Sequence, residues 1–307
     1  MQKYKFLCKS LVKILSLQSY TLFRGMKIFR TQKEIAAYFK EFRTKKTTVG
    51  FVPTMGALHK GHTSLIEQSL ENNHITIASI FVNPTQFNQK EDLENYPRTL
   101  KSDLILLKKT NCDVLFIPSV NEIYSKNIVS NHFNFDGLDM HLEGKFRKGH
   151  FNGVGTIVKK LLEITMPNNA YFGEKDFQQL QIIRKMVEKN NLNVTIVSCP
   201  TCRENNGLAM SSRNKHLTKE ERKSASIIYK ILLKVAEKIN TQSIDSIKKW
   251  VINEFKENPS FDIEYFVIAD EETFEDATNL TPKKQLRAFI AVYAGTIRLI
   301  DNISLNS

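Results

Sequence analysis

Short apolar runs alternate with amphipathic stretches over the first two thirds of this 307-residue chain, and this alternation limits the possible folds more than any other feature. Buried strands are predicted at residues 48–53, 75–82, 114–117, 170–172 and 194–198, with a further short strand at 132–135. Helices are predicted between them at residues 31–42, 62–71, 100–110, 154–164 and 177–189. Strands that alternate with helices predict a Rossmann-like α/β domain, in which helices cover both faces of a parallel sheet.

The pattern changes near residue 200, where helices are followed by strands. Thr218 and Glu221 form a predicted capping box at the start of a long helix. The predicted elements are helices at 218–238 and 244–255 and strands at 261–268 and 287–300. This order predicts a separate, smaller C-terminal α+β domain. The expected organisation is an N-terminal extension outside the fold at 1–25, a Rossmann-like domain at 26–200 and the smaller domain at 201–307.

The net charge of +12 is compatible with a nucleic acid, a membrane surface or a polyanionic small molecule as partner. Five basic residues lie in the first 25 residues, which contain no acidic residue, and the other basic residues are scattered along the chain. Scattered lysines favour a solvated surface over a nucleic-acid-binding stripe, and no apolar run has the length of a membrane span. We therefore expect a chain that binds neither nucleic acid nor membrane.

The basic, moderately apolar stretch at residues 1–25 has two interpretations. It could be a weak targeting segment, or it could be sequence upstream of a start at Met26. The second interpretation is favoured because no small-residue cleavage site is clear.

The chain contains four cysteines, too few for a disulfide framework in a chain of this length. This usage fits a reducing cytoplasm. Cys199 and Cys202 form a CxxC sequence, but zinc would need a second pair, and the residues that follow read as a loop. Two thiols at the end of a strand are favoured over a redox or metal site.

The junction between the first buried strand and the next helix carries two histidines in the sequence Met55-Gly56-Ala57-Leu58-His59-Lys60-Gly61-His62. His59 and His62 are three residues apart at a helix start, so their imidazoles lie on one face of its first turn. The free N–H groups and the positive dipole end there attract phosphate, and Gly61 leaves room for a phosphate or a flat ring. Ordinary surface histidines or a zinc pair are the alternatives, although a zinc pair would more often be spaced by four. In this position HxGH resembles the nucleotide-binding motif of nucleotidylyltransferases and class I aminoacyl-tRNA synthetases.

Two further polar segments are candidates for the same nucleotide. Met210-Ser211-Ser212-Arg213 places two hydroxyls and a guanidinium in a loop, which suits phosphate contact. Gly173-Glu174-Lys175-Asp176 follows a short strand, where ligands of α/β sheets collect. Taken alone, each segment could be a solvated turn; their combination with HxGH favours a nucleotide site.

Several stretches taken together resemble the pantothenate synthetase family, the pantoate–beta-alanine ligases. The resemblance extends from about Met26 to the C-terminus and does not include the first 25 residues. The stretches that carry it are VPTMGALHKGH (52–62), SIFVNPTQF (79–87), YPRT (96–99), HFNGV (150–154), YFGEKDFQQL (171–180) and GLAMSSRN (207–214).

The resemblance implies a two-step reaction with ATP. Pantoate attacks the α-phosphorus and pyrophosphate leaves, after which beta-alanine attacks the pantoyl-adenylate to give pantothenate and AMP. It assigns His62 as proton donor, with His59, Lys175, Ser211 and Arg213 on the phosphates. The implied ATP-binding residues are Met55, Gly56, Ala57, Leu58, His59, Lys60, Gly61, His62, Gly173, Glu174, Lys175, Asp176, Cys202, Met210, Ser211, Ser212 and Arg213.

The resemblance also implies the remaining binding sites. Gln86 and Gln179 would hold pantoate, Gln86 would also lie near beta-alanine, and Asn83 would lie near the phosphates or the incoming amine. Mg²⁺ would accompany ATP, with Asp103 as a candidate outer-shell partner. Pantoate, beta-alanine and ATP are thus the expected small-molecule substrates of a cytoplasmic homodimer.

Three rival interpretations remain open. Another adenylyl-transfer enzyme of the same superfamily would leave Gln86 and Gln179 unexplained. A basic nucleic-acid-binding protein would fit the net charge but not the scattered lysines. A catalytically dead relative would not need intact site residues.

Overall fold

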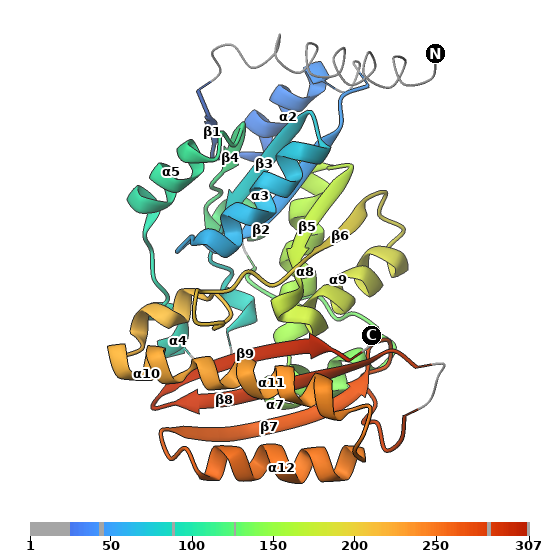
Figure 1. Ribbon diagram of the computed structural model, residues 1–307. Helices are drawn as coiled ribbons and strands as arrows, with labels where there is room; N and C mark the ends of the chain where they lie inside the picture. Colours follow the sequence, from blue (N-terminus) through green and yellow to red (C-terminus); the bar gives the residue numbers. More distant parts are fainter. Residues whose placement is uncertain (1–24, 43–45, 88–89, 126, 281–283, 306–307) are drawn as a thin grey trace, which may run out of the picture.

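The structure is a computed structural model that describes residues 25–42, 46–87, 90–125, 127–280 and 284–305 (Figure 1). The expected extension at 1–25 therefore lies almost entirely outside the described residues. Among the helices that the structure describes, every one is too short or too polar to cross a bilayer.

A six-stranded sheet, parallel at every strand pairing, forms the N-terminal half, in the order β1-β4-β3-β2-β5-β6 (Figure 1). Its strands are β1 (Lys27–Phe29), β2 (Val49–Thr54), β3 (Ile75–Ile80), β4 (Val114–Phe116), β5 (Asn169–Gly173) and β6 (Thr195–Cys199). The predicted parallel sheet is confirmed. The sequence prediction missed β1, a three-residue edge strand that pairs with β4 and is mostly exposed.

Helices cover both faces of this sheet because successive side chains of a strand point to opposite faces. Phe51 and Ile77 belong to the apolar core beneath α2, α8 and α9, whereas their neighbours Val52 and Ala78 belong to the core beneath α3 and α5. The helices of this half are α2 (Gln32–Phe42), α3 (Lys60–Asn72), α4 (Lys90–Glu94), α5 (Leu100–Lys109), α6 (Val120–Tyr124), α7 (Leu142–Phe146), α8 (His150–Thr165) and α9 (Phe177–Lys189). Short 3₁₀ turns occur at Pro84–Gln86, Leu138–Met140 and Glu174–Asp176.

Close packing leaves no room for a Cβ at several glycines of this half, among them Gly50 and Gly153. A Cβ on Gly50 of β2 would lie 2.1 Å from the hydroxyl oxygen of Ser69 on α3. A Cβ on Gly153 of α8 would lie 2.3 Å from the carbonyl oxygen of Thr85. The second contact seats α8 directly on the turn that carries Gln86.

The prediction of a strand at 132–135 is wrong. This extended segment pairs with no strand and instead runs along α8. The side chains of that helix satisfy its backbone: Asn131 N–H donates to Thr156 Oγ1 at 2.7 Å and Phe133 N–H donates to Asn152 Oδ1 at 3.0 Å. Side-chain acceptors here replace the partner strand.

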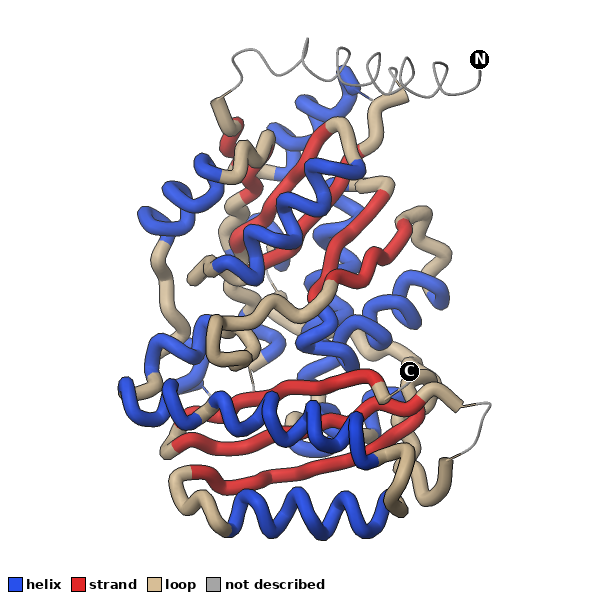
Figure 2. The backbone as a smooth tube through the Cα atoms, viewed as in Figure 1, coloured by secondary structure: helices blue, strands red, loops and turns tan. Residues whose placement is uncertain are grey.

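The C-terminal part is a three-stranded antiparallel sheet in the order β7-β8-β9 (Figure 2). Its elements are α10 (Lys219–Ser224), α11 (Ser226–Lys238), α12 (Ile244–Lys256), β7 (Phe261–Asp270), β8 (Leu286–Ala294) and β9 (Ile297–Ser304), preceded by a 3₁₀ turn at Ser212–His216. The α+β composition of this part is confirmed, and Thr218 and Glu221 form the predicted capping box.

Two predicted elements of this part divide in the structure. The strand predicted at 287–300 is a hairpin, because Gly295 adopts a φ of +56° and turns β8 into β9. The helix predicted from 218 to 238 breaks at Ala225. There the Asn206 side-chain amide donates to the Arg222 carbonyl at 3.1 Å, and Ile228 N–H bonds back three residues to Ala225.

Candidate active site

A cleft of about 290 Å³ lies between the carboxyl edge of the parallel sheet and the antiparallel sheet. Residues at and after the ends of the neighbouring strands β3, β2, β5 and β6 line it, together with residues of β9. Ligands of open α/β sheets bind at this edge. The predicted site residues that line the cleft are Met55, His59, Gly61, His62, Asn83, Gln86, Gly173, Lys175, Asp176, Gln179, Cys202, Met210, Ser211, Ser212 and Arg213.

Five predicted ATP-binding residues lie outside this lining. Gly56, Ala57 and Leu58 are buried behind the cleft, and the Lys60 side chain is exposed at the start of α3. The Glu174 carboxylate accepts a hydrogen bond from the Ser198 hydroxyl of β6 at 2.7 Å. These residues shape the loops from which their neighbours reach the cleft.

Asp103 of α5 holds the loop between β2 and α3. It is buried, and its two carboxylate oxygens accept hydrogen bonds from the backbone N–H groups of Ala57 (3.1 Å) and Leu58 (2.9 Å). The hydroxyl of Thr99 donates to the same carboxylate at 3.1 Å. The loop needs this support because Gly56 and Ala57 both adopt left-handed conformations, with φ values of +83° and +50°. Asp103 thus acts on the backbone of the HxGH loop.

The two histidines form a reciprocal cap at the start of α3. His59 Nδ1 accepts from Gly61 N–H at 3.1 Å, and His62 Nδ1 accepts from His59 N–H at 3.3 Å. A neutral imidazole whose Nδ1 accepts carries its proton on Nε2. The backbone therefore fixes both tautomers and leaves both Nε2–H groups as donors.

Both histidines are neutral at pH 7. Burial lowers the pKa of His59 to about 4, and the positive charges of Lys175 and Lys215 lower it further. Burial lowers the pKa of His62 to about 3, with contributions from His59, whose ring centre is 4.1 Å away, and from Lys175. The pair can thus donate two hydrogen bonds to an anion without holding two positive charges side by side.

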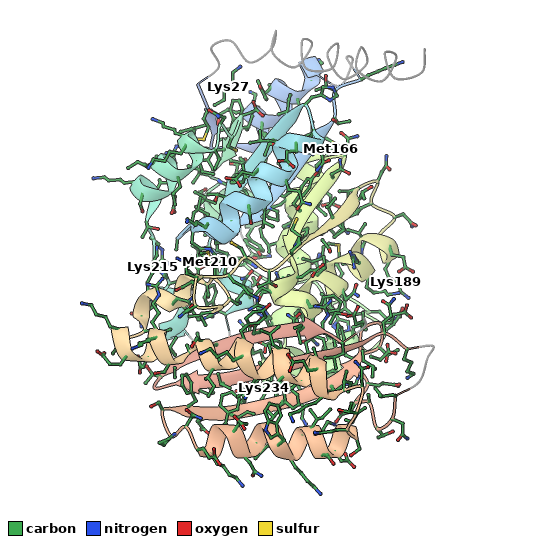
Figure 3. All side chains as sticks on the ribbon, viewed as in Figure 1. Lys27, Met166, Lys189, Met210, Lys215 and Lys234 are labelled. Carbon is green, nitrogen blue, oxygen red and sulfur yellow. The ribbon has the colours of Figure 1, made fainter. Side chains whose placement is uncertain are left out.

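The segment after β6 brings the MSSR sequence back to the histidines. Met210 N–H donates to the Cys202 carbonyl at 2.9 Å, and Arg203 forms an isolated antiparallel bridge with Ala209. A Cβ on Gly61 would lie 3.6 Å from the Met210 Cβ, so the loop contacts the first turn of α3. Figure 3 shows Met210 and Lys215 on this segment, between the two sheets.

The two cysteines of the CxxC sequence have separate surroundings in this segment. Cys199 is buried at the end of β6, and burial together with the Glu174 carboxylate raises the pKa of its thiol to about 11. Cys202 Sγ lies 3.6 Å from Met210 Sδ. Both thiols are free.

Residues 173–176, the GEKD turn, are held in place by hydrogen bonds from the C-terminal sheet. Asn302 of β9 is buried, and its side-chain amide donates to the carbonyl oxygens of Glu174 and Lys175, both at 2.9 Å. Arg287 of β8 donates to the amide oxygen of Asn302 at 2.6 Å. The turn presents the Lys175 ammonium 3.5 Å from the Asp176 carboxylate.

The amide side chains at the other end of the cleft differ in their freedom. Asn83 is fixed: it accepts from the Tyr124 hydroxyl at 2.5 Å and donates to the Gly153 carbonyl at 3.1 Å. Gln86 accepts from Asn83 at 3.2 Å. The Gln179 side-chain amide lines the cleft and forms no hydrogen bond with any of the described residues. It is therefore available to a ligand.

The apolar wall of the cleft includes Pro53, Met55 and Phe172. Pro53 and Phe172 lie near the carboxyl ends of β2 and β5, and Phe172 is also part of the core. An acid with an apolar body and a few hydroxyls fits such a surface beside Gln86 and Gln179.

Tyr96, Arg147 and His150 are among the polar residues of the lining that had no predicted role. Burial raises the pKa of the Tyr96 hydroxyl, an effect that is opposed by nearby Ser212 and Arg213. Arg147 donates to His150 Nε2 at 3.0 Å. The YPRT and HFNGV stretches contain Tyr96 and His150, so the sequence marked both, but nothing in the sequence showed that they face the same cleft as the histidines.

The cationic side chains of the cleft suit a polyanion. Lys175, Arg213 and Arg147 line it together with the carboxylates of Asp176, Glu143 and Asp301. Two of these carboxylates are paired with other cations, Glu143 with Arg298 and Asp301 with Arg203. Within the described ranges, no group of three or more histidine, cysteine or acidic side chains could hold a metal ion. Phosphate binding by donors and cations is the chemistry that these residues support.

Comparisons with known proteins agree with this site. The profile of the family described as "Pantoate-beta-alanine ligase" matches residues 27–304. A pantothenate synthetase of Flavobacterium psychrophilum is 52% identical over 281 residues, which cover 91% of this chain and all of the relative. A pantothenate synthetase of Thermotoga petrophila is 44% identical over 91% of this chain and all of the relative.

Solved structures show the same fold. Pantothenate synthetase from Thermus thermophilus superposes with a TM-score of 0.85 at 37% identity, covering 92% of this chain and all of that one. A pantoate–beta-alanine ligase from Francisella tularensis, complexed with "Beta-gamma ATP and Beta-alanine", gives a TM-score of 0.75 at 37% identity over 92% of this chain and 99% of that one.

Proposed function

The chain belongs to the pantoate–beta-alanine ligase family, and we propose that the cleft described above joins pantoate to beta-alanine at the expense of ATP. This assignment rests on one observation: residues of the HxGH, GEKD and MSSR segments, together with Gln86 and Gln179, line the same cleft. The Francisella relative of the same fold is complexed with "Beta-gamma ATP and Beta-alanine", which supports a nucleotide and an amine as ligands.

The reaction proceeds in two balanced steps. A carboxylate oxygen of pantoate attacks the α-phosphorus of ATP, the bond to the β-phosphate breaks, and pyrophosphate leaves. The free amine of beta-alanine then attacks the acyl carbon of pantoyl-adenylate. The acyl–oxygen bond breaks, AMP leaves, and the nitrogen loses a proton as the amide forms. The substrate supplies each nucleophile, so the protein contributes position and charge stabilisation.

His59 and His62 donate hydrogen bonds from Nε2 to the phosphates of ATP. Their fixed tautomers support this role, because no reorganisation is needed when charge moves onto the leaving pyrophosphate. The low pKa values make His62 a neutral proton donor, which shares its Nε2 hydrogen with an oxygen on phosphorus.

Lys175, Ser211 and Arg213 neutralise and hold the triphosphate, with Ser212 and Met210 beside them. Ser211 caps the turn that starts at Ser212, accepting from Arg213 N–H at 3.2 Å, so the loop has a defined shape around its hydroxyls. Asp176 accepts from ribose hydroxyls, and the Cys202 segment borders the adenine. The backbone of residues 56–58 and 173–174 completes the ATP site.

Gln179 and Gln86 bind pantoate through its hydroxyl groups. The unpartnered amide of Gln179 and the partly engaged amide of Gln86 support this assignment. Asn83, fixed by Tyr124, orients Gln86. Beta-alanine enters beside Gln86.

The nucleotide enters as MgATP. Magnesium is usually bound by phosphate oxygens and water with one or two carboxylates, so a dedicated protein cage is not needed. Both carboxylate oxygens of Asp103 accept hydrogen bonds from backbone N–H groups, so Asp103 supports the loop and is a less suitable partner for the metal.

We infer further that the enzyme is a cytoplasmic homodimer. Each chain has a sheet domain at 26–200 and a smaller domain at 201–307. Sedimentation of the purified protein tests the dimer.

One assay tests this function. Pyrophosphate release is measured with MgATP and pantoate, in the absence and presence of beta-alanine. A single turnover of pyrophosphate without the amine, and multiple turnovers with AMP and pantothenate when it is added, are expected. Release that does not depend on pantoate would contradict the assignment.

A further inference from the structure

The second half-reaction requires a cation that the assignments above do not supply. Beta-alanine carries a carboxylate that takes no part in the chemistry but must be brought out of water into the cleft. An uncompensated carboxylate is costly in such a site. Lys175 and Arg213 face the triphosphate, so the carboxylate of the amine needs another partner.

Arg147 is a cation of the cleft whose position is fixed but whose charge is not fully compensated. It lies between α7 and α8, and its side chain is 28% exposed. Its Nη1 lies 3.7 Å from the nearest Glu143 oxygen, which is beyond hydrogen-bonding distance.

Glu143 is engaged elsewhere. Its two carboxylate oxygens accept from Arg298 at 2.7 and 2.8 Å, and the Tyr265 hydroxyl donates to one of them at 2.9 Å. Burial alone would raise the pKa of Glu143, but Arg298 outweighs it and the pKa is lowered. Burial lowers the pKa of Arg147; Glu143 and Asp176 oppose this effect, and Arg213 and Arg298 add to it. The nearest of these carboxylates is thus already hydrogen-bonded to another guanidinium, which leaves the Arg147 fork available to an anion.

His150 determines where this guanidinium points. His150 Nδ1 lies 2.9 Å from the Gln86 carbonyl oxygen, which can only accept, so Nδ1 carries the proton. Nε2 is then an acceptor, and it receives a hydrogen bond from Arg147 at 3.0 Å. Burial, reinforced by Arg147, lowers the pKa of His150 to about 4, which keeps the ring neutral. One imidazole thus connects Arg147 to the backbone of Gln86.

This connection relates Arg147 to the acyl group. Gln86 is assigned to pantoate, so the amine must approach the acyl carbon beside it, and the rest of the amine substrate extends away from Gln86. We propose that Arg147, held by His150, binds the carboxylate of beta-alanine and selects amines that carry one. This inference rests on the proposed function.

The acid substrate is a less suitable occupant. The pantoate carboxylate must keep a free oxygen for attack on phosphorus, and a guanidinium fork would make it a poorer nucleophile. The carboxylate of beta-alanine is unchanged throughout the reaction, so a permanent bidentate contact does not hinder any step.

The test separates the two half-reactions in an Arg147→Gln variant. Single-turnover pyrophosphate release with pantoate and MgATP should change by at most a few-fold. The KM for beta-alanine should rise roughly 10- to 100-fold, the loss expected for a hydrogen bond to a charged group. The ratio of kcat/KM for beta-alanine over that for n-propylamine should fall by a similar factor.

Two further variants complete the test. Arg147→Lys keeps the charge but loses the planar fork, and should give an intermediate KM for beta-alanine. Lys145→Gln removes an exposed charge of α7 and should leave both half-reactions unchanged. Equal loss of adenylation and amide formation in Arg147→Gln and Arg147→Lys would place Arg147 on the triphosphate and overturn the proposal. An unchanged preference for beta-alanine over n-propylamine would overturn it too. Absent pyrophosphate release in the unaltered enzyme would instead refute the proposed function.

Discussion

At the scale of single residues, the site depends on which atom of each imidazole carries the proton. Backbone N–H groups hold the Nδ1 atoms of His59 and His62 as acceptors, so both rings present Nε2–H to the cleft. The opposite tautomer is fixed at His150, because a carbonyl oxygen faces its Nδ1. Three neutral histidines thus differ in what their Nε2 atoms offer, a donor at His59 and His62 and an acceptor for Arg147 at His150, according to their backbone partners.

Replacing His62 by alanine should remove one donor to the triphosphate. Pantoate-dependent pyrophosphate release should fall roughly 100- to 1,000-fold, as for loss of a donor to a developing charge. Stopped-flow or quench measurement of the first turnover checks this. His132→Ala, at an exposed position outside the cleft, is the matched control and should retain full activity. Near-normal release in His62→Ala would exclude this histidine from the mechanism.

Stability should decrease as the pH falls below about 6.5, the ordinary pKa of histidine. The pKa values of His59, His62 and His150 are lowered to about 4, 3 and 4, so these rings stay neutral in the folded state while the unfolded chain binds protons. Each histidine should contribute up to about 1.4 kcal/mol per pH unit between its unfolded and folded pKa. Chemical denaturation from pH 7 to pH 4.5 measures the slope.

A His59→Gln/His62→Gln double variant provides the comparison for this slope. Its stability should depend less on pH than that of the unaltered enzyme. Identical slopes in the two proteins would show that the two buried imidazoles titrate normally.

The sequence predicted which polar groups would face the cleft but not their supports. HxGH and MSSR are short local patterns, so their residues could be proposed for the site from the order of amino acids alone. The carboxylate of Asp103 reaches the loop from 45 residues away, and no local pattern distinguishes such a partner from a metal ligand. Arg147 was missed for the same reason, since its role depends on a contact with His150 and on the engagement of Glu143 by a distant arginine.

At the scale of elements, the loop between β2 and α3 is constrained by its backbone conformation and by Asp103. Two consecutive left-handed residues turn the chain at the end of β2, and Asp103 holds the N–H groups of Ala57 and Leu58. The conformation of this loop determines where the first turn of α3, and hence both imidazoles, lies.

Asp103→Asn should loosen this loop. The asparagine side chain has only one oxygen to accept a backbone N–H, and its NH₂ group would face the second N–H, which needs an acceptor. The lost charged hydrogen bonds should reduce the free energy of unfolding by about 1.5–3 kcal/mol and lower kcat for adenylation more than they alter the KM for pantoate. Thermal melting and half-reaction kinetics measure both effects. Normal adenylation with unchanged Mg²⁺ dependence would contradict a role for Asp103 in positioning the histidines.

Most of the elements that the sequence prediction missed or merged carry no clear local signal. The edge strand β1 is too short and too exposed to show a periodic pattern. The segment 132–135 has the composition of a strand but finds its acceptors on α8. The break at Ala225 depends on the Asn206 side chain, whereas the hairpin at Gly295 had a local signal, the glycine itself, within the long apolar run.

At the scale of the whole molecule, the C-terminal sheet has two partners. Ile290 of β8 packs with α11 and α12, whereas its neighbour Phe289 packs with Phe177 of α9, at a ring-centre distance of 6.1 Å. Asn302 adds a direct hydrogen bond to the GEKD turn. The sequence predicted two parts from the change of pattern, but it could not predict their shared core, which depends on contacts between residues far apart in the chain. These contacts hold the GEKD turn and the C-terminal sheet as one unit, so we expect any closure over ATP to come mainly from the segment at 200–213.

Asn302→Ala tests this link. It removes two hydrogen bonds to the backbone of the GEKD turn, so Lys175 should lose its fixed position. The KM for ATP should rise roughly 10-fold or more, while the KM for beta-alanine changes little. Asn258→Ala, which removes a helix-end hydrogen bond of α12 far from the cleft, is the control. Equal effects of the two substitutions on the KM for ATP would show that the contact serves stability alone.

A crystal structure with pantoate and a non-hydrolysable ATP analogue would test most directly whether the two loops bind the same triphosphate. We expect the triphosphate to lie within hydrogen-bonding distance, about 2.7–3.2 Å, of the Nε2 atoms of the HxGH histidines and also of the Ser211 hydroxyl or the Arg213 guanidinium. A nucleotide whose phosphates contact one of these two groups and lie far from the other would contradict this expectation.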